Sequence, residues 1–124
     1  MLKIAVLLTS FNRCSLTISC LNSLSKVDVP SGYLLDFFLV DDASSDGTSQ
    51  EVNRRYPQVN IFKGDGELYW NRGMYTAWEK ASQTYDFDFY LWLNDDTLLH
   101  ENALEILIKT LIEVEVNSII VGTI

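Results

Sequence analysis

Short apolar runs and amphipathic segments alternate along the whole chain. The apolar runs are bounded by polar or turn-forming residues, which is typical of buried strands; they occupy residues 4–8, 34–40, 59–62, 87–93 and 119–121. Between them, apolar residues recur at helical spacing and predict helices over residues 13–26, 48–56, 72–84 and about 104–112. Strands that alternate with helices predict a mostly parallel sheet covered on both faces, an α/β architecture.

Polar residues follow the carboxyl ends of three of the predicted strands. They are residues 9–13, Asp41-Asp42 and Asn94-Asp95-Asp96. The carboxyl ends of parallel strands meet at one edge of a sheet, and ligands bind there in open α/β folds. Carboxylate oxygens at such an edge suit a divalent cation. The pattern therefore predicts one ligand-binding edge.

Both acidic pairs also have an ordinary structural interpretation. Residues 95–97 can cap a following helix, because Asp and Thr are favoured at helix N-termini. Residues 41–42 can belong to a turn, because Asp side chains bond nearby backbone groups. Turn chemistry accounts well for Asp46-Gly47 but less well for two acids directly at a strand end, which favours a ligand role for residues 41–42. For residues 94–97 alone, the cap and the ligand site both stay open.

Two further segments carry specific predictions. Thr48 is expected to cap the short second helix, with Glu51 as its capping-box partner. Aromatic residues gather around Asn71-Arg72-Gly73. Of these, Tyr75 and Trp78 are expected in the core, whereas Tyr69 and Trp70 precede the predicted helix and are candidates to border a ligand cleft.

Composition narrows the classes of protein. The 124 residues are 48% hydrophobic and 21% charged, as in a single globular domain. The net charge of −8 makes nucleic acid an unsuitable partner. An anionic ligand would need a metal ion or basic groups, for which Arg13, Lys63 and Arg72 are available.

A few sequence features indicate the state of the cysteines and the location of the protein in the cell. Cys14 and Cys20 lie about 9 Å apart along one predicted helix and off a shared face, so reduced thiols and a cytoplasmic location are expected. No signal-peptide pattern begins the chain, and no apolar stretch approaches the ~20 residues of a membrane span. The chain has no glycine-rich phosphate loop, and its single histidine, His100, is expected at the surface.

Taken in order, the motifs resemble glycosyltransferase family 2. The resemblance covers nearly the whole chain, through residues 6–13, 39–48 and 93–97 and through an Asn-x-Gly element at Asn71-Arg72-Gly73. Residues 94–97 are most similar to the rhamnosyltransferase-like branch. The resemblance implies a GT-A fold, a Rossmann-like three-layer α/β sandwich. Residues 1–124 would be its nucleotide-sugar-binding part, without the acceptor-binding half.

The resemblance also implies a role for each motif residue. The donor would be a nucleoside diphosphate sugar of the UDP or dTDP type, held with Mn²⁺ or Mg²⁺. Thr9 and Phe11 would lie against the base, Asp41 would bond the base ring, and Asp42 would neighbour that contact. The remaining donor-site residues would be Asn71, Asn94 and Asp95, with Asp96 as the metal ligand. Asn94 departs from the usual first Asp and brings no charge, which lowers the expected metal affinity.

As in that family, the expected reaction is transfer of a hexosyl group to a saccharide or lipid-linked acceptor, in polysaccharide biosynthesis for the cell envelope. The expected location is the cytoplasm, including peripheral association with the inner face of the membrane. In inverting members, a carboxylate later in the chain is the catalytic base. No residue here matches that motif, so no base is assigned, and the chain is expected to bind donor without transferring sugar.

Two other classes of protein have a similar length or topology. A receiver-type signalling module of similar length needs acids after its first strand, an Asp after its third and a Lys after its fifth, and the chain has none of these. A sugar-nucleotide nucleotidyltransferase has a basic, glycine-rich loop after its first strand, for which Arg13 is the one indication.

Overall fold

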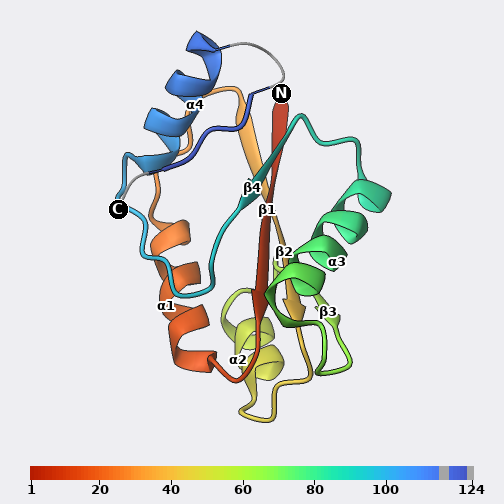
Figure 1. Cartoon of the computed structure of the whole chain (residues 1–124). Coiled ribbons are helices and arrows are strands. Elements are labelled where there is room, and N and C mark those ends of the chain that lie inside the picture. Colours follow the sequence, from red (N-terminus) through yellow and green to blue (C-terminus); the bar gives the residue numbers. More distant parts are fainter. Residues whose placement is uncertain (115–117, 123–124) are drawn as a thin grey trace.

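A parallel sheet lies between two layers of helices (Figure 1). The computed structural model describes residues 1–114 and 118–122. Its strands are β1 (Leu2–Ser10), β2 (Tyr33–Asp41), β3 (Asn60–Lys63) and β4 (Phe89–Trp92), which pair in the order β3-β2-β1-β4. The helices are α1 (Cys14–Ser25), α2 (Thr48–Arg55), α3 (Tyr69–Thr84) and α4 (Ala103–Glu113). The predicted α/β architecture is confirmed.

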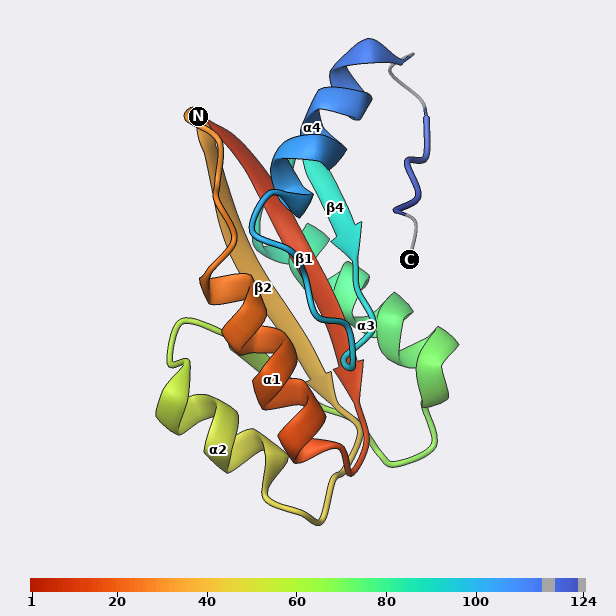
Figure 2. The same ribbon diagram turned by 90° about the vertical axis from the view of Figure 1, so that its left-hand side faces the viewer.

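The two faces of the sheet are covered unequally. Helices α1, α2 and α4 pack on one face and α3 packs on the other (Figure 2). Side chains alternate along a strand, so Val6 and Leu8 of β1 face α1, whereas Ala5 and Leu7 face α3. Burial on both faces explains why β1 is an uninterrupted apolar run.

The expected fifth strand is absent from the described residues. Residues 118–122 form neither helix nor strand, and the side chains of Ile119 and Val121 are largely exposed. In the described part of the chain, β4 pairs with β1 and with no other strand. A β-branched run becomes a strand only where its backbone groups find pairing partners. The prediction for residues 119–121 is therefore wrong.

Helix α3 begins at Tyr69, three residues earlier than expected, so Tyr69 and Trp70 belong to its first turn. Its buried face consists of small or unbranched residues: Gly73, Met74, Ala77 and Ala81. Tyr75 and Trp78 lie off this face and are 60% and 41% exposed. The prediction that they belong to the core is wrong, because close packing on the sheet selects the small residues of the helix.

The start of α2 also differs from expectation. Gly47 occupies the N-cap position with a φ of 82°, and the Asp46 carboxylate accepts hydrogen bonds from the backbone N–H and the hydroxyl of Thr48. Glu51 pairs with Arg54 and Arg55 of the same helix instead of closing a capping box. The prediction of a capping box is wrong; Asp46 supplies the cap.

Gly73 of α3 lies against the side chain of Thr9 in β1. A Cβ atom at this position would lie 2.2 Å from Thr9 Oγ1 and 2.8 Å from Thr9 Cβ. Only a residue without a side chain leaves room for Thr9, so the glycine of the Asn-x-Gly element sets the distance between α3 and the end of β1.

We expect Gly73→Ala to lower the free energy of unfolding by about 1–3 kcal/mol, because the added methyl group overlaps Thr9. The loss should appear although alanine is favoured over glycine in helices by ~1 kcal/mol. Urea unfolding followed by circular dichroism measures it. Ser82→Ala, at an exposed position of the same helix, is the control and should change stability by less than about 0.5 kcal/mol. A Gly73→Ala protein as stable as wild type would contradict this packing.

Candidate functional site

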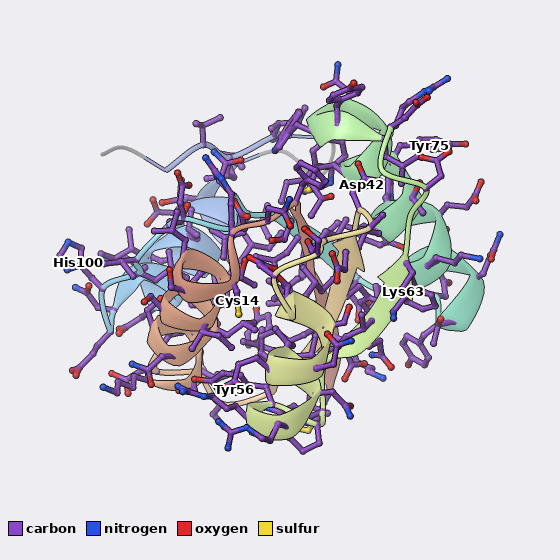
Figure 3. All side chains as sticks on the ribbon, turned by 90° about the horizontal axis from the view of Figure 1, so that it is seen from below. Cys14, Asp42, Tyr56, Lys63, Tyr75 and His100 are labelled. Atoms are coloured by element: carbon purple, nitrogen blue, oxygen red, sulfur yellow. The ribbon has the colours of Figure 1, made fainter. Side chains whose placement is uncertain are left out.

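The loops that follow the four strands lie on one edge of the sheet, which we call the rim. They comprise residues 11–13 after β1, 42–47 after β2, 64–68 after β3 and 93–102 after β4. Figure 3 looks onto this edge and shows Asp42 beside the first turn of α3. The predicted gathering of polar strand ends is therefore present.

The first two loops are joined by side-chain hydrogen bonds. Asn12 Oδ1 accepts the backbone N–H of Ser45 at 2.7 Å, and the Asn12 N–H donates to the Ser44 hydroxyl at 2.9 Å. The carboxylate of Asp46 accepts the backbone N–H of Cys14 at 2.9 Å. The loop after β1 and the start of α1 are thus fixed against the loop after β2.

Asp41 and Asp42 are buried, each 3% exposed, and bind the chain itself. Asp41 accepts the backbone N–H of Ser44 at 3.0 Å and the hydroxyl of Ser49. Asp42 accepts three backbone N–H groups of the segment that leads into α3; they belong to Gly66 (2.8 Å), Leu68 (3.0 Å) and Tyr69 (3.2 Å). One carboxylate therefore secures the loop before α2, and the other caps α3.

The second acidic pair does not cap a helix. Helix α4 begins at Ala103 with Asn102 at its N-cap, so Asp95 and Asp96 lie on a loop and the cap interpretation is wrong. Asp95 is buried and accepts hydrogen bonds from Arg13 Nη1 at 2.9 Å and from the Thr17 hydroxyl at 3.5 Å. The side chain of Asp96 is 47% exposed and lies 3.7 Å from Arg13 Nη1. The two acids of this pair therefore have different surroundings.

Arg13 joins the first loop to the last. Its hydrogen bond with Asp95, aided by the negative charges of Asp95 and Asp96, raises the pKa of the Arg13 guanidinium. The group stays charged and neutralises part of the acidic pair. Of the other two candidate basic residues, Lys63 ends β3 and Arg72 lies in the first turn of α3, both exposed.

One further contact closes the rim. The indole N–H of Trp70, in the first turn of α3, donates to Asn94 Oδ1 at 2.9 Å. The loop after β1 is thus bonded to the loop after β2, that loop to α3, α3 to the loop after β4, and that last loop back to Arg13. Such a closed set of contacts holds the rim in place before any ligand binds.

Backbone strain concentrates at this edge. Among the described residues, three non-glycine residues have a positive φ: Asn12 (51°), Ala43 (60°) and Tyr69 (56°). Each lies at the rim or at the start of α3, and each such conformation costs about 1–3 kcal/mol. Strain of this kind collects at ligand-binding sites, which favours a functional role for the rim.

Most of the residues expected at the site gather there, with different exposure. Thr9 is partly buried against Gly73 and donates to the Val40 carbonyl at 3.3 Å, whereas Phe11 and Asn71 are exposed. His100 is exposed and lies well away from Asp42 in Figure 3, as expected for a surface residue.

The sequence alone did not predict three groups that make hydrogen bonds at the rim: the side chains of Asn12 and Thr17 and the indole N–H of Trp70. The position of Asn12 within the first motif was a usable signal. For Thr17, in the first turn of α1, the sequence held none.

The thiol of Cys20 lies beneath the last loop of the rim. It is buried and donates to the Asn94 carbonyl at 3.7 Å. Burial, together with the negative charges of Asp95 and Asp96, raises the pKa of Cys20 to about 12. The group is a neutral thiol near pH 7 and supports the loop instead of acting as a nucleophile. Both cysteines are free, as expected.

The second acidic pair offers a metal ion one carboxylate, that of Asp96, so the ion's other ligands would be waters and a substrate. Within the described residues, no group of three or more His, Cys, Asp or Glu side chains is arranged to hold an ion. Both oxygens of Asp95 and the side-chain oxygen of Asn94 accept hydrogen bonds from the protein. The half-exposed carboxylate of Asp96 remains. One carboxylate suits Mg²⁺ or Mn²⁺ whose other ligands are waters and substrate phosphates.

The family is established by comparison with known proteins. The profile of "Glycosyl transferase family 2" matches residues 5–124, so the chain belongs to this family. The match removes the receiver and nucleotidyltransferase alternatives; the rhamnosyltransferase-like branch stays a prediction. No curated protein matches the sequence.

Solved glycosyltransferase structures share the fold. S. aureus TarS 1–349 superposes with a TM-score of 0.71 at 22% identity, over 90% of this chain and 33% of that one. Its complex with UDP-GlcNAc gives 0.71 at 23%, over 90% and 32%. The mannosyltransferase PcManGT from Pyrobaculum calidifontis, in complex with GDP-Man and Mn²⁺, gives 0.68 at 23%, over 87% and 32%. The chain has the GT-A fold and spans about a third of each of these three structures.

No helix in the described part of the chain has the length and apolar character needed to span a membrane.

We expect Asp42→Ala to lower the free energy of unfolding by about 2–4 kcal/mol, because three backbone N–H groups around the start of α3 lose their acceptor. Asp65→Ala is the matched control. Asp65 is an exposed carboxylate in the neighbouring loop that accepts one N–H, from Glu67, and its removal should cost less than about 1 kcal/mol. Urea unfolding compares the two. Equal effects would contradict the assignment of Asp42 as the anchor of α3.

Proposed function

We propose that the rim binds a nucleoside diphosphate sugar of the UDP or dTDP type for hexosyl transfer. The observation that carries the proposal is the division among the acids at the strand ends. Asp41, Asp42 and Asp95 are buried and bonded to the chain, whereas Asp96 presents a half-exposed carboxylate beside them. A rigid edge with one available carboxylate suits a diphosphate and its metal ion.

Asp96 is the proposed ligand for Mn²⁺ or Mg²⁺. A bound cation offsets the charge of the diphosphate and stabilises the leaving group as the sugar departs. The complexes of TarS with UDP-GlcNAc and of PcManGT with GDP-Man and Mn²⁺ support both a nucleotide sugar and a metal. The net charge of −8 disfavours an anionic donor, so a bound cation would strengthen its binding.

Asp41 is the proposed acceptor for the ring N–H of uracil or thymine, with Thr9 and Phe11 beside the base. Its two oxygens bind Ser44 and Ser49, and a carboxylate has lone pairs for further donors. Asp42, with three N–H partners, acts through the loop that it holds, and Asn71 completes the donor side from the first turn of α3.

The proposed acceptor is a saccharide or lipid-linked saccharide of polysaccharide biosynthesis, met in the cytoplasm or at the inner face of the membrane. This chain is assigned the donor-binding role, without a catalytic base.

Calorimetric titration with UDP, in MnCl₂ and in EDTA, tests the proposal. We expect Asp96→Asn to lower the Mn²⁺-dependent UDP affinity at least about tenfold, because it removes the carboxylate that would share the ion with the diphosphate. Asp86→Asn, an exposed carboxylate in the loop before β4 at the opposite edge of the sheet, should leave the affinity unchanged. An Asp96→Asn protein that binds UDP and Mn²⁺ like wild type would contradict the metal assignment, and absence of UDP binding by wild type would refute the function.

The role of Asp41 is tested without changing this buried residue. Uracil carries a ring N–H where cytosine carries an acceptor nitrogen, so a carboxylate against the base should favour UDP over CDP by at least about tenfold. Competition between the two nucleotides for the wild-type protein measures the ratio. Equal affinities would contradict a contact between Asp41 and the ring N–H.

A further inference from the structure

The hydrogen bond between Trp70 and Asn94 determines which way the Asn94 amide faces. An indole N–H can only donate, so the atom 2.9 Å from Trp70 Nε1 must be the amide oxygen. The amide NH₂ group is consequently turned away from Trp70. Asn94 is exposed, and the hydrogen bonds found among residues 1–114 and 118–122 include none donated by its Nδ2. A donor with two hydrogens is thus oriented at the rim, and no acceptor for it lies among the described residues.

The ring of Trp70 is itself held in place. It meets Trp92, the last residue of β4, edge to face at 6.0 Å between centroids, and Trp92 meets Trp78 at 5.6 Å. Its backbone belongs to the first turn of α3, which Asp42 caps. The indole N–H therefore has a direction set from both the helix and the strand.

The position of Asn94 and its lack of charge indicate which ligand it would bind. It stands two residues before Asp96 and directly before Asp95, where a third carboxylate would repel an anionic diphosphate. An amide adds no charge there and offers two N–H groups. Its oxygen already accepts the Trp70 N–H, whereas its two N–H groups donate to no acceptor among the described residues, so the amide is better suited to bond phosphate oxygens than to bind a cation.

We propose that Trp70 is a positioning residue that orients the Asn94 amide as a hydrogen-bond donor to the diphosphate of the nucleotide sugar. The proposal rests on the proposed function and deepens it. Part of the diphosphate binding then comes from a neutral donor and does not require the metal ion. Asn94 stands where the family usually has Asp. In this proposal the residue at this position binds an anion, whereas an Asp would bind a cation.

A double-mutant cycle tests the proposal with Trp70→Phe, Asn94→Ala and the double variant. Phenylalanine keeps an aromatic ring beside Trp92 but has no N–H to donate. UDP affinity is measured by calorimetry in EDTA, and uridine affinity by NMR titration. We expect each single variant to lose about five- to tenfold in UDP affinity, and the double variant to lose no more than Asn94→Ala alone. Uridine, which lacks phosphates, should bind all four proteins within about twofold.

Two more variants make the result specific. Trp78→Phe alters the same aromatic cluster without touching Asn94 and should leave UDP affinity unchanged. In Asn94→Asp the second carboxylate oxygen replaces the NH₂ group, so UDP affinity in EDTA should fall below that of Asn94→Ala. This variant tests the role of the amide even if Trp70→Phe does not fold.

The outcomes separate the two proposals. Three results would overturn the positioning role and leave the proposed function standing. They are losses in UDP affinity that multiply in the double variant, an equal loss in uridine affinity, and an Asn94→Asp protein that binds UDP in EDTA like wild type. A wild-type protein that binds no UDP with or without Mn²⁺ would overturn both.

Discussion

The buried carboxylate of Asp42 is the contact on which the rest of the rim depends. A carboxylate without water is tolerated only when its oxygens are bonded, and here three backbone N–H groups of the segment entering α3 satisfy it. By fixing the first turn of α3, this contact places Gly73 against Thr9 and directs Trp70 to Asn94. The end of β2 therefore determines how α3 meets both β1 and the loop after β4.

The acids of the rim differ in whether their carboxylate oxygens are bonded to the protein or exposed. Asp41, Asp42 and Asp95 give their oxygens to the protein, and Arg13 ties the last of them to the loop after β1. Asp96 keeps a half-exposed carboxylate 3.7 Å from Arg13 Nη1, and Asn94, two residues before it, turns its NH₂ group away from Trp70. Positive φ angles at Asn12, Ala43 and Tyr69 fit such an edge, because the surrounding hydrogen bonds hold strained backbone in place.

Local pattern predicted the alternation of strands and helices and the gathering of polar residues at one edge, because both follow from short-range periodicity and from parallel pairing. The local pattern failed where contacts between residues far apart in the sequence determine the structure. The run at 119–121 looks like a strand but has no pairing partner among the described residues, and Trp78 looks like a core residue although Gly73 and the alanines take that face. The bond from Asp42 to Gly66 joins residues 24 positions apart, which no local spacing reveals.

The central claim is that the ligand and its metal ion bind together at the rim. Amide NMR spectra of the protein with UDP test it, when Mg²⁺ is replaced stepwise by Mn²⁺. We expect UDP with Mg²⁺ to shift the signals of residues 12–13, 42–45 and 94–97. Mn²⁺ should broaden the signals of residues 94–97 most, and only when UDP is present. The contradicting result is a response centred elsewhere, such as the apolar groove of about 380 Å³ beside Leu24, Tyr33 and Phe37.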